Sequence, residues 1–297
     1  MTAHAMKASV PTGPRPDPLP LHERLLSHVY RLPAFVVATA FFGSLALLVS
    51  LFEKNGRWQH RIAQAWARAS VLIGGTRVTV LGRERLSGKP AVYACNHLSY
   101  MDTPVIFSSL PFQFRIVARS GLFKLPFIGW WLGRSGQVSV DVGNPRASIA
   151  SLASAARTLK AGMPLFIFPE GGRTESGEMA KFMQGPAFMA IRAQLPLVPL
   201  ALIGTHELLP MHANTIHTVP VTLAVGEEIQ TRGMTMKQVN ELTALLEERV
   251  AALYYEHSWR KKAEALAATP PGTAEVGNLE TVTISRDLRE TEEARRR

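Results

Sequence analysis

The sequence predicts an α/β domain with a mixed, mostly parallel sheet flanked by helices, preceded by a membrane-associated helical segment. Short β-rich runs alternate with helical stretches from residue 76 onward, which is typical of layered α/β domains. A long apolar run without charges lies upstream of this alternation. The chain has 297 residues and is 46% hydrophobic, which is enough to build a substantial core.

The apolar run at residues 32–52 is the candidate membrane segment. It carries no charged side chain, and as a helix it would span roughly 30 Å, the thickness of a bilayer's hydrocarbon core. A buried core helix is the alternative, but such helices rarely run this far without a charge. The next helical stretch, 58–73, has arginines along one side, so it fits an interfacial helix or a domain-packing helix equally well.

The alternating region supplies the predicted elements of the sheet domain. Helices are clearest at 145–160 and 185–193, and an amphipathic helix at 236–255 closes the domain. The predicted strands are 77–81, 91–94, 114–118, 164–168, 197–203 and 219–225. The predicted organisation is a disordered leader at 1–30, membrane-anchoring helices at 31–75, the sheet domain at 76–265 and a disordered charged tail at 266–297.

Charge and cysteine content limit the possible partners. The formal net charge of +10 favours anionic partners such as phosphates or an anionic membrane face. Nucleic acid is the weaker interpretation, because zinc-finger spacing, basic helices and aromatic-basic interleaving are all missing. The single cysteine, Cys95, excludes an intramolecular disulfide, and its apolar neighbours predict a buried side chain.

His97 and Asp102 are the first pair of residues that suggest chemistry. On a regular helix their spacing would hold them apart, but Pro104 favours the first turn of a helix and leaves 97–102 as a turn. On a turn the carboxylate can approach the imidazole, fix its tautomer and leave the other ring nitrogen as a base. Capping and loop roles for these residues are the alternative. Ser99, two residues after His97, makes a serine hydrolase a further alternative, although the glycine-flanked elbow of such enzymes is missing.

The second candidate motif follows the predicted strand 164–168. Pro169 ends that strand, and Glu170 precedes Gly171 and Gly172, which allow close backbone approach to a ligand. Arg173 can then hold an anion through charge-assisted hydrogen bonds. An ordinary turn is the alternative.

Four ordered blocks resemble the glycerolipid acyltransferase family, of the 1-acylglycerol-3-phosphate O-acyltransferase type. Asn96-His97 with Asp102 matches the family's N-H-x4-D block, and the run from Phe168 to Gly171 with Arg173 matches its F-P-E-G-x-R block. The run 121–130 (GLFKLPFIGW) resembles the second block, and 197–200 with Gly204 resembles the fourth.

The resemblance implies an activity and a role for each matching residue. His97 would take the proton from the free hydroxyl of 1-acylglycerol-3-phosphate, and Asp102 would orient the ring. The hydroxyl oxygen would attack an acyl thioester, from acyl-CoA or acyl-carrier protein, to give phosphatidic acid without a metal or other cofactor. The residues expected to bind substrate are Asn96, Arg119, Glu170, Gly171, Gly172, Arg173 and Pro199.

Three departures from the family pattern leave the acceptor open. Gly172 stands where the family often has threonine, Val142 follows Asp141 where arginine is frequent, and Met183 replaces a common lysine. An acyltransferase acting on another lysolipid therefore remains an alternative. Two further alternatives come from other classes of protein: a membrane-anchored lipid hydrolase that uses Ser99 or a metal bound by His97, and a non-catalytic lipid-binding module. We expect the chain at the cell membrane, with membrane lipids as partners and the catalytic domain facing the cytoplasm.

Overall fold

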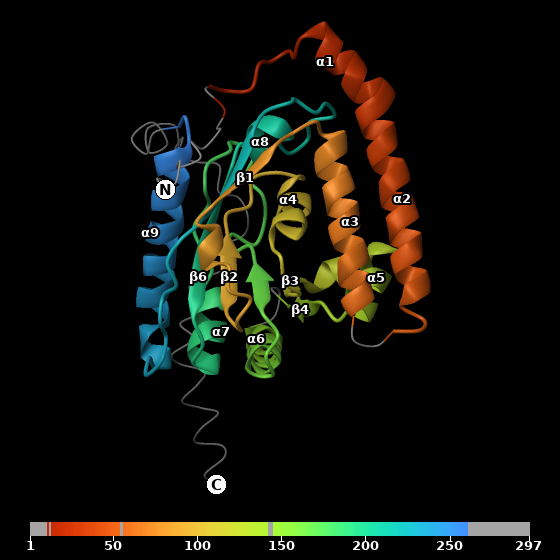
Figure 1. Cartoon of the computed structure of the whole chain (residues 1–297). Coiled ribbons are helices and arrows are strands. Elements are labelled where there is room, and N and C mark those ends of the chain that lie inside the picture. Colours follow the sequence, from red (N-terminus) through yellow and green to blue (C-terminus); the bar gives the residue numbers. More distant parts are fainter. Residues whose placement is uncertain (1–10, 12, 54–55, 142–144, 261–297) are drawn as a thin grey trace, which may run out of the picture.

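The computed structural model describes residues 11, 13–53, 56–141 and 145–260, and within them seven strands form one sheet (Figure 1). The strand order is β1-β7-β6-β2-β5-β3-β4, and every neighbouring pair is parallel except β6 with β7. The strands are β1 (Val78–Leu81), β2 (Val92–Cys95), β3 (Arg115–Arg119), β4 (Val138–Val140), β5 (Leu165–Ile167), β6 (Leu197–Ile203) and β7 (Val221–Val225). The predicted mixed, mostly parallel sheet is therefore confirmed.

Five of the predicted strands match observed strands to within a residue or two at each end, and β6 matches its predicted range. β4 was not predicted, because it is only three residues long and each of its side chains is half-buried. Its residues do alternate between apolar and polar, but a run of three is too short to identify a strand.

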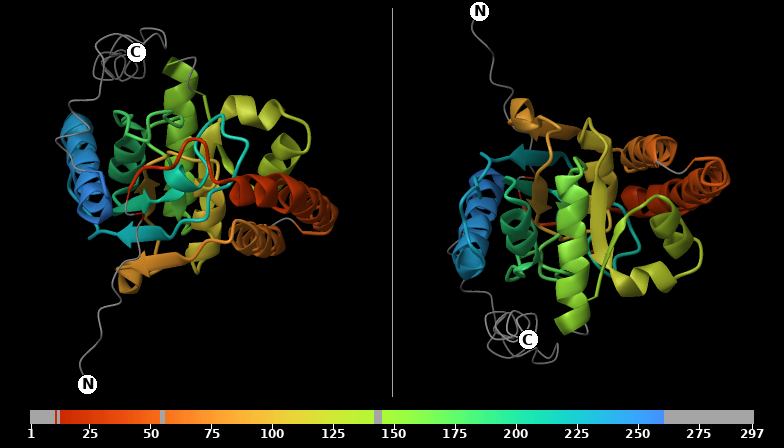
Figure 2. Two further views of the ribbon diagram at one scale, coloured as in Figure 1. Left: turned by 90° about the horizontal axis from the view of Figure 1, so that it is seen from above. Right: turned by 90° about the horizontal axis from the view of Figure 1, so that it is seen from below.

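Helices cover both faces of the sheet and form two hydrophobic cores (Figure 2). One face carries α6 (Pro145–Lys160), α7 (Gly185–Ala193) and α9 (Val239–His257), the last preceded by a 3₁₀ turn, η4 (Met236–Gln238). The other face carries α3 (Arg57–Ile73), α4 (Asp102–Ser109) and α5 (Ile128–Arg134). Shorter turns are η2 (Arg83–Arg85), η3 (Ser120–Lys124) and α8 (Thr205–Leu208). The helices predicted at 145–160 and 185–193 are observed with those bounds.

The N-terminal helix is longer than the sequence indicated. It runs through α1 (Leu21–Leu26), η1 (Ser27–Arg31) and α2 (Leu32–Val49) without a break. Residues 21–30, which were assigned to the leader, are therefore helical, while residues 1–10 and the predicted tail lie outside the described residues. Among the residues that the structure describes, Leu21–Val49 is the one helix long and apolar enough to cross a membrane, and only 6% of its apolar window is buried.

This exposed helix is tied to the sheet domain near its start. Side chains of the N-terminal segment bind the loop between α8 and β7, which is far away in the sequence. The contacts are Arg15 to the Thr215 carbonyl at 2.8 Å, Glu23 to His217 at 2.5 Å, Ser27 to the Ile216 amide at 2.8 Å and Arg31 to the Ile216 carbonyl at 3.0 Å. The helix is thus held by its side chains as well as by its chain connection.

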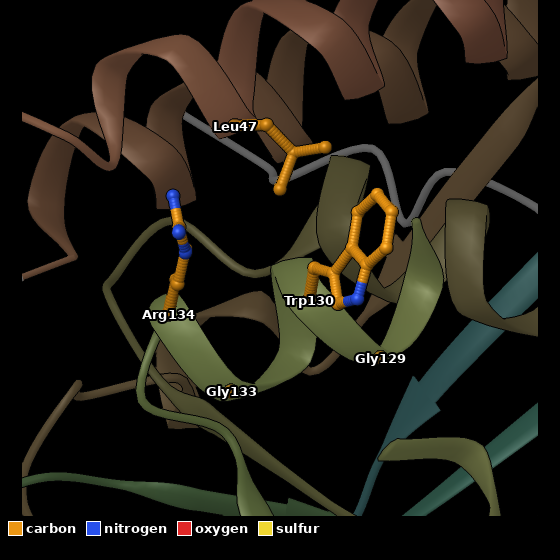
Figure 3. Close-up of a pocket in the computed structure, with 5 residues that line it drawn as sticks. All are labelled: Leu47, Gly129, Trp130, Gly133 and Arg134. Atoms are coloured by element: carbon orange, nitrogen blue, oxygen red, sulfur yellow. The ribbon is translucent and has the colours of Figure 1, made fainter. Parts of the chain in front are cut away.

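Near its other end, α2 packs against α3 and α5. α3 buries Gln59, His60 and Ala67 against the domain, which fits the domain-packing interpretation of this stretch. A cleft of about 540 Å³ separates α2 from α5 (Figure 3). Its walls are Leu47 of α2 and Gly129, Trp130, Gly133 and Arg134 of α5.

Candidate active site

The two sequence motifs meet at the carboxyl ends of neighbouring strands. β2 and β5 pair in parallel, with Ala94 opposite Ile167, although about seventy residues separate them in the sequence. His97 follows β2 by two residues, and the run from Phe168 to Arg173 follows β5 directly. Both motifs therefore emerge at the same edge of the sheet, where open α/β folds place their ligands.

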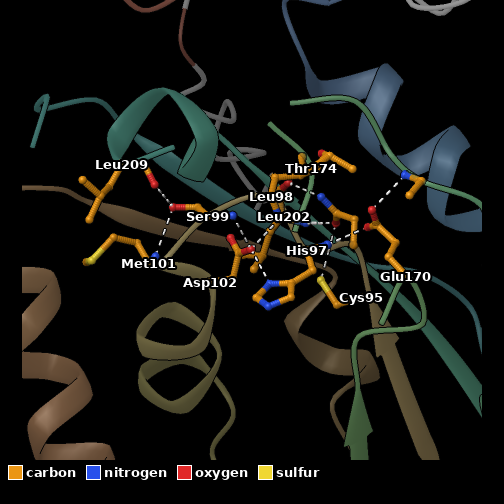
Figure 4. Close-up of polar contacts among 12 residues, drawn as sticks. Cys95, His97, Leu98, Ser99, Met101, Asp102, Glu170, Thr174, Leu202 and Leu209 are labelled. Atoms are coloured by element: carbon orange, nitrogen blue, oxygen red, sulfur yellow. Dashed lines mark hydrogen bonds and ion pairs between the residues drawn. The ribbon is translucent and has the colours of Figure 1, made fainter. Parts of the chain in front are cut away.

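His97 and Asp102 form a hydrogen-bonded pair, as the turn predicted (Figure 4). Nδ1 of His97 lies 2.8 Å from Oδ2 of Asp102, and the Asp102 carboxylate is fully buried. The same oxygen accepts the backbone N–H groups of Leu98 at 2.7 Å and Ser99 at 2.8 Å. The turn thus wraps around the carboxylate, and α4 begins at Asp102, one to two residues earlier than Pro104 suggested.

The imidazole of His97 is also held by an aromatic stack. Its ring lies 3.8 Å from that of Phe168, centroid to centroid, at an interplanar angle of 11°. Phe168 in turn meets Phe166 edge to face. With one nitrogen bound to Asp102 and one ring face covered by Phe168, the remaining nitrogen, Nε2, has a defined direction. Phe168 was not predicted as a site residue, because a stack across two strands leaves no local signal in the sequence.

Glu170 has a different role from the expected substrate contact. Its Oε1 accepts the backbone N–H of His97 at 2.7 Å, and its Oε2 accepts that of Ala180 at 2.8 Å. Each oxygen therefore accepts one backbone N–H, and together they join the main chain of His97 to the loop that follows β5. Burial raises the pKa of Glu170 to about 8, against the smaller lowering by these two hydrogen bonds.

This raised pKa predicts a specific pH dependence of stability. The unfolded state releases the Glu170 proton near pH 4.5, whereas the folded state keeps it to a higher pH. The contribution of Glu170 to the free energy of unfolding is therefore complete below about pH 4.5. It is lost progressively as the pH rises toward about 8. In Glu170→Gln this loss, on the order of a few kcal/mol in the free energy of unfolding, should be absent. Urea denaturation of both proteins from pH 5 to pH 9 measures it, and parallel stability curves would contradict it.

Arginines and glycines form the anion cradle, which we define as Arg119, Gly171, Gly172 and Arg173. Gly171 has a φ of +68°, and a Cβ there would lie 3.4 Å from Nη2 of Arg119. At Gly172 the corresponding distance is 3.9 Å, so the Arg119 guanidinium lies against both glycines. Cζ of Arg173 stacks 4.2 Å from the ring centroid of Tyr100. Tyr100, like Phe168, is a neighbour of the site that the sequence did not reveal.

Two predicted substrate contacts, Asn96 and Pro199, belong to the sheet instead. The fully buried amide of Asn96 donates to the Leu202 carbonyl at 2.9 Å and accepts from its N–H at 2.8 Å, which extends the pairing of β2 with β6. Pro199 is buried inside β6, and its ring packs against Gly226. Neither side chain is free to bind a ligand, so these two assignments are corrected.

Ser99 is equally unavailable as a nucleophile. Its fully buried hydroxyl donates to the Leu209 carbonyl at 2.6 Å and accepts the N–H of Met101 at 3.0 Å. Both contacts hold the turn around Asp102. Among the described residues, moreover, no three His, Cys, Asp or Glu side chains gather into a group that could hold a metal ion.

Comparisons with known proteins agree with the fold and the motifs. A 1-acyl-sn-glycerol-3-phosphate acyltransferase of Chlamydomonas reinhardtii is 33% identical over 71% of this chain and 65% of its own length. The chloroplastic protein LPAT1 of Arabidopsis thaliana, with the same activity in its name, is 31% identical over 70% of this chain and 60% of its own. The chain thus spans somewhat less than two thirds of these relatives. The fold is also similar to the crystal structure of PlsC from Thermotoga maritima, an LPA acyltransferase by its title, with a TM-score of 0.64 and 22% sequence identity. The match covers 85% of this chain and 99% of that one, and it supports the fold.

A histidine–aspartate turn and a glycine–arginine loop lie at the ends of adjacent parallel strands in this α/β domain. Residues 77–203 match the family model described as Acyltransferase. This part of the chain is thus similar to the acyltransferase family, in agreement with the four sequence blocks.

Proposed function

We propose that this protein transfers a fatty acyl group from an acyl thioester to the free hydroxyl of 1-acylglycerol-3-phosphate, giving phosphatidic acid. The observation that carries the proposal is the 2.8 Å pair of His97 and Asp102, which follows β2, the strand beside the one that leads into the anion cradle. The activity named for the relatives in green algae and plants supports the same substrate.

The His97–Asp102 pair supplies the base. With Nδ1–H donating to Asp102, Nε2 of His97 can accept the proton of the acceptor hydroxyl. The hydroxyl oxygen forms the new ester bond at the thioester carbonyl carbon, the carbon–sulfur bond breaks, and the proton returns from the imidazolium to the leaving thiolate. Transfer is direct, since the Ser99 hydroxyl and the Cys95 thiol are both buried in the fold.

The anion cradle supplies recognition of the headgroup. Arg119 brings a permanent positive charge to the two glycines, and Arg173, which follows them directly, holds a second one over the ring of Tyr100. The carboxyl group of Glu170 is turned toward backbone N–H groups instead. A phosphate monoester fits this charge distribution, because guanidinium groups bind phosphate through paired hydrogen bonds. The donor is acyl-CoA or acyl-carrier protein, and both carry the anionic character that a chain with a net charge of +10 attracts.

Membrane attachment places this chemistry at the lipid surface. The exposed helix Leu21–Val49 supports insertion into a bilayer, where the lysolipid acceptor resides. We assign the protein to the cell membrane, with the acyltransferase domain on the cytoplasmic side where acyl thioesters are available.

The function is tested with a panel of acceptors that differ in their headgroups. Lysophosphatidic acid, lysophosphatidylethanolamine and monoacylglycerol are each supplied with one labelled acyl-CoA, and lipid products are read by mass spectrometry. We expect lysophosphatidic acid to be the preferred acceptor. In Arg173→Ala its KM should rise about 10- to 150-fold, the equivalent of roughly 1.5–3 kcal/mol of charge-assisted hydrogen bonding.

The KM for monoacylglycerol, which lacks the phosphate, should be unchanged in Arg173→Ala. The matched control is Arg192→Ala, which removes an exposed arginine at the end of α7 and should leave every acceptor unaffected. Preference for an uncharged acceptor would replace the proposed substrate with another lipid. Release of free fatty acid in place of diacylated product would identify a hydrolase.

A further inference from the structure

The segment between β3 and β4 presents an unusual cluster of apolar side chains to the outside. It comprises η3 and α5, and we refer to residues 120–134 as the β3–β4 segment. Its exposed large apolar residues are Leu122, Leu125, Phe127, Ile128 and Trp130, each between 42% and 68% exposed. A patch of this density on a folded domain indicates an interaction surface.

Phe127 lies at the centre of this cluster in a strained conformation. Its φ is +61°, a region that residues other than glycine rarely adopt, and its side chain is 68% exposed. The fold therefore accepts backbone strain at a residue whose ring is turned outward, away from the core. Strain of this kind concentrates at functional positions, which indicates that the exposed ring of Phe127 has a binding role.

The charges around this segment favour an anionic surface as its partner. Residues 115–140 contain no aspartate or glutamate, while Arg119, Lys124 and Arg134 lie within or beside the apolar cluster. Apolar and aromatic side chains surrounded by cations are typical of elements that enter the interface of an anionic bilayer. Tryptophan in particular favours that interface, and Trp130 and Trp131 are adjacent here.

The β3–β4 segment also continues the apolar surface of α2. α5 packs against α2, and Arg134 of α5 donates to the Ser50 hydroxyl at 3.2 Å. The cleft between the two helices is lined by Leu47 and Trp130, with Arg134 at one end (Figure 3). A bilayer that surrounds the exposed side of α2 therefore also reaches α5.

We propose that the β3–β4 segment is a second membrane-inserting element, which enters the same lipid leaflet as α2. This inference rests on the membrane attachment in the proposed function and adds its consequence for the site. Arg119, at the end of β3, immediately precedes the segment and contacts the glycines of the anion cradle. Insertion of the segment thus fixes the cradle at the depth of the lipid phosphates.

The single cysteine of the chain makes a direct test possible. Cys95 is fully buried, and burial raises the pKa of its thiol, so it resists alkylation in the folded protein. Phe127→Cys can therefore be labelled selectively with an environment-sensitive fluorophore in the full-length protein. The labelled protein is bound to vesicles of phosphatidylcholine and phosphatidylglycerol, and quenching is measured with aqueous iodide and with lipids that carry a quencher on the acyl chain.

We expect vesicles to abolish iodide quenching at position 127 and to introduce quenching by the labelled lipids. Phe41→Cys, on the exposed face of α2, is the membrane reference, and Glu248→Cys, exposed on α9, is the aqueous reference. Ile128→Cys, also exposed, repeats the measurement if the first variant folds poorly. A fluorophore at 127 and 128 that stays open to iodide while position 41 is protected would overturn the proposal.

These readouts do not depend on turnover. A protein that transfers no acyl group can still insert the segment, and a protein that transfers acyl groups with a water-exposed segment refutes this inference alone. If position 41 is open to iodide as well, the membrane attachment itself fails, and this inference fails with it.

Discussion

Replacing His97 with glutamine should reduce acyl transfer by about 10²- to 10⁴-fold, the usual contribution of a general base. Glutamine retains a polar side chain of similar size, but it has no nitrogen that can accept the proton of the acceptor hydroxyl. The fold should be preserved, because Asp102 still accepts the N–H groups of Leu98 and Ser99. The measurement is single-turnover transfer to lysophosphatidic acid, together with urea denaturation.

A second histidine–carboxylate pair provides the control for this experiment. His212 lies 3.1 Å from Glu175, but both side chains are largely exposed, so the pair contributes little. His212→Gln should therefore transfer acyl groups at the wild-type rate. Wild-type turnover in His97→Gln would show that the base is another group.

The second large effect is expected for Asp102→Asn. The carboxylate holds the His97 ring by Nδ1 and balances the positive charge that the ring acquires as it takes the proton. An amide supplies no such charge, and the equivalent change in serine proteases lowers kcat by about 10⁴. We expect a loss of about 10³- to 10⁴-fold in kcat, with a much smaller change in the KM for either substrate.

Loss of stability must be separated from loss of chemistry here, because Asp102 is buried and binds two backbone N–H groups. Ser99→Ala is the matched control: it removes two hydrogen bonds from the same turn without touching His97. It should cost about 1–3 kcal/mol of unfolding free energy and retain turnover. If Ser99→Ala and Asp102→Asn lose activity in proportion to their stability, Asp102 acts through folding alone.

The parts of this fold that the sequence revealed were those with a local pattern. β6 is a continuous apolar run of seven residues, and α6 and α7 are long enough to display helical periodicity, whereas β4 has only three residues. Residues 21–30 contain charged and polar side chains that conceal their helix. Their order comes from contacts with the loop between α8 and β7, which no local pattern reports.

The candidate site divides in the same way. His97 and Asp102 could be paired from their spacing, because one turn brings them together. The roles of Asn96 and Glu170 could not, since a polar side chain beside a base is equally able to bind a ligand or a backbone group. Only the three-dimensional contacts with Leu202, His97 and Ala180 decide between these two roles.

The links between the N-terminal helix and the loop before β7 have a consequence for substrate choice. A domain joined to its anchor by a flexible peptide could sample many heights above the lipid, whereas this one is locked to its helix by Arg15, Glu23, Ser27 and Arg31. Under the proposed function, lysolipids would arrive by lateral diffusion and meet His97 at one fixed level. A lipid whose hydroxyl lies deeper or shallower would then not be acylated, so a rigid anchor would select the position of the hydroxyl that reacts.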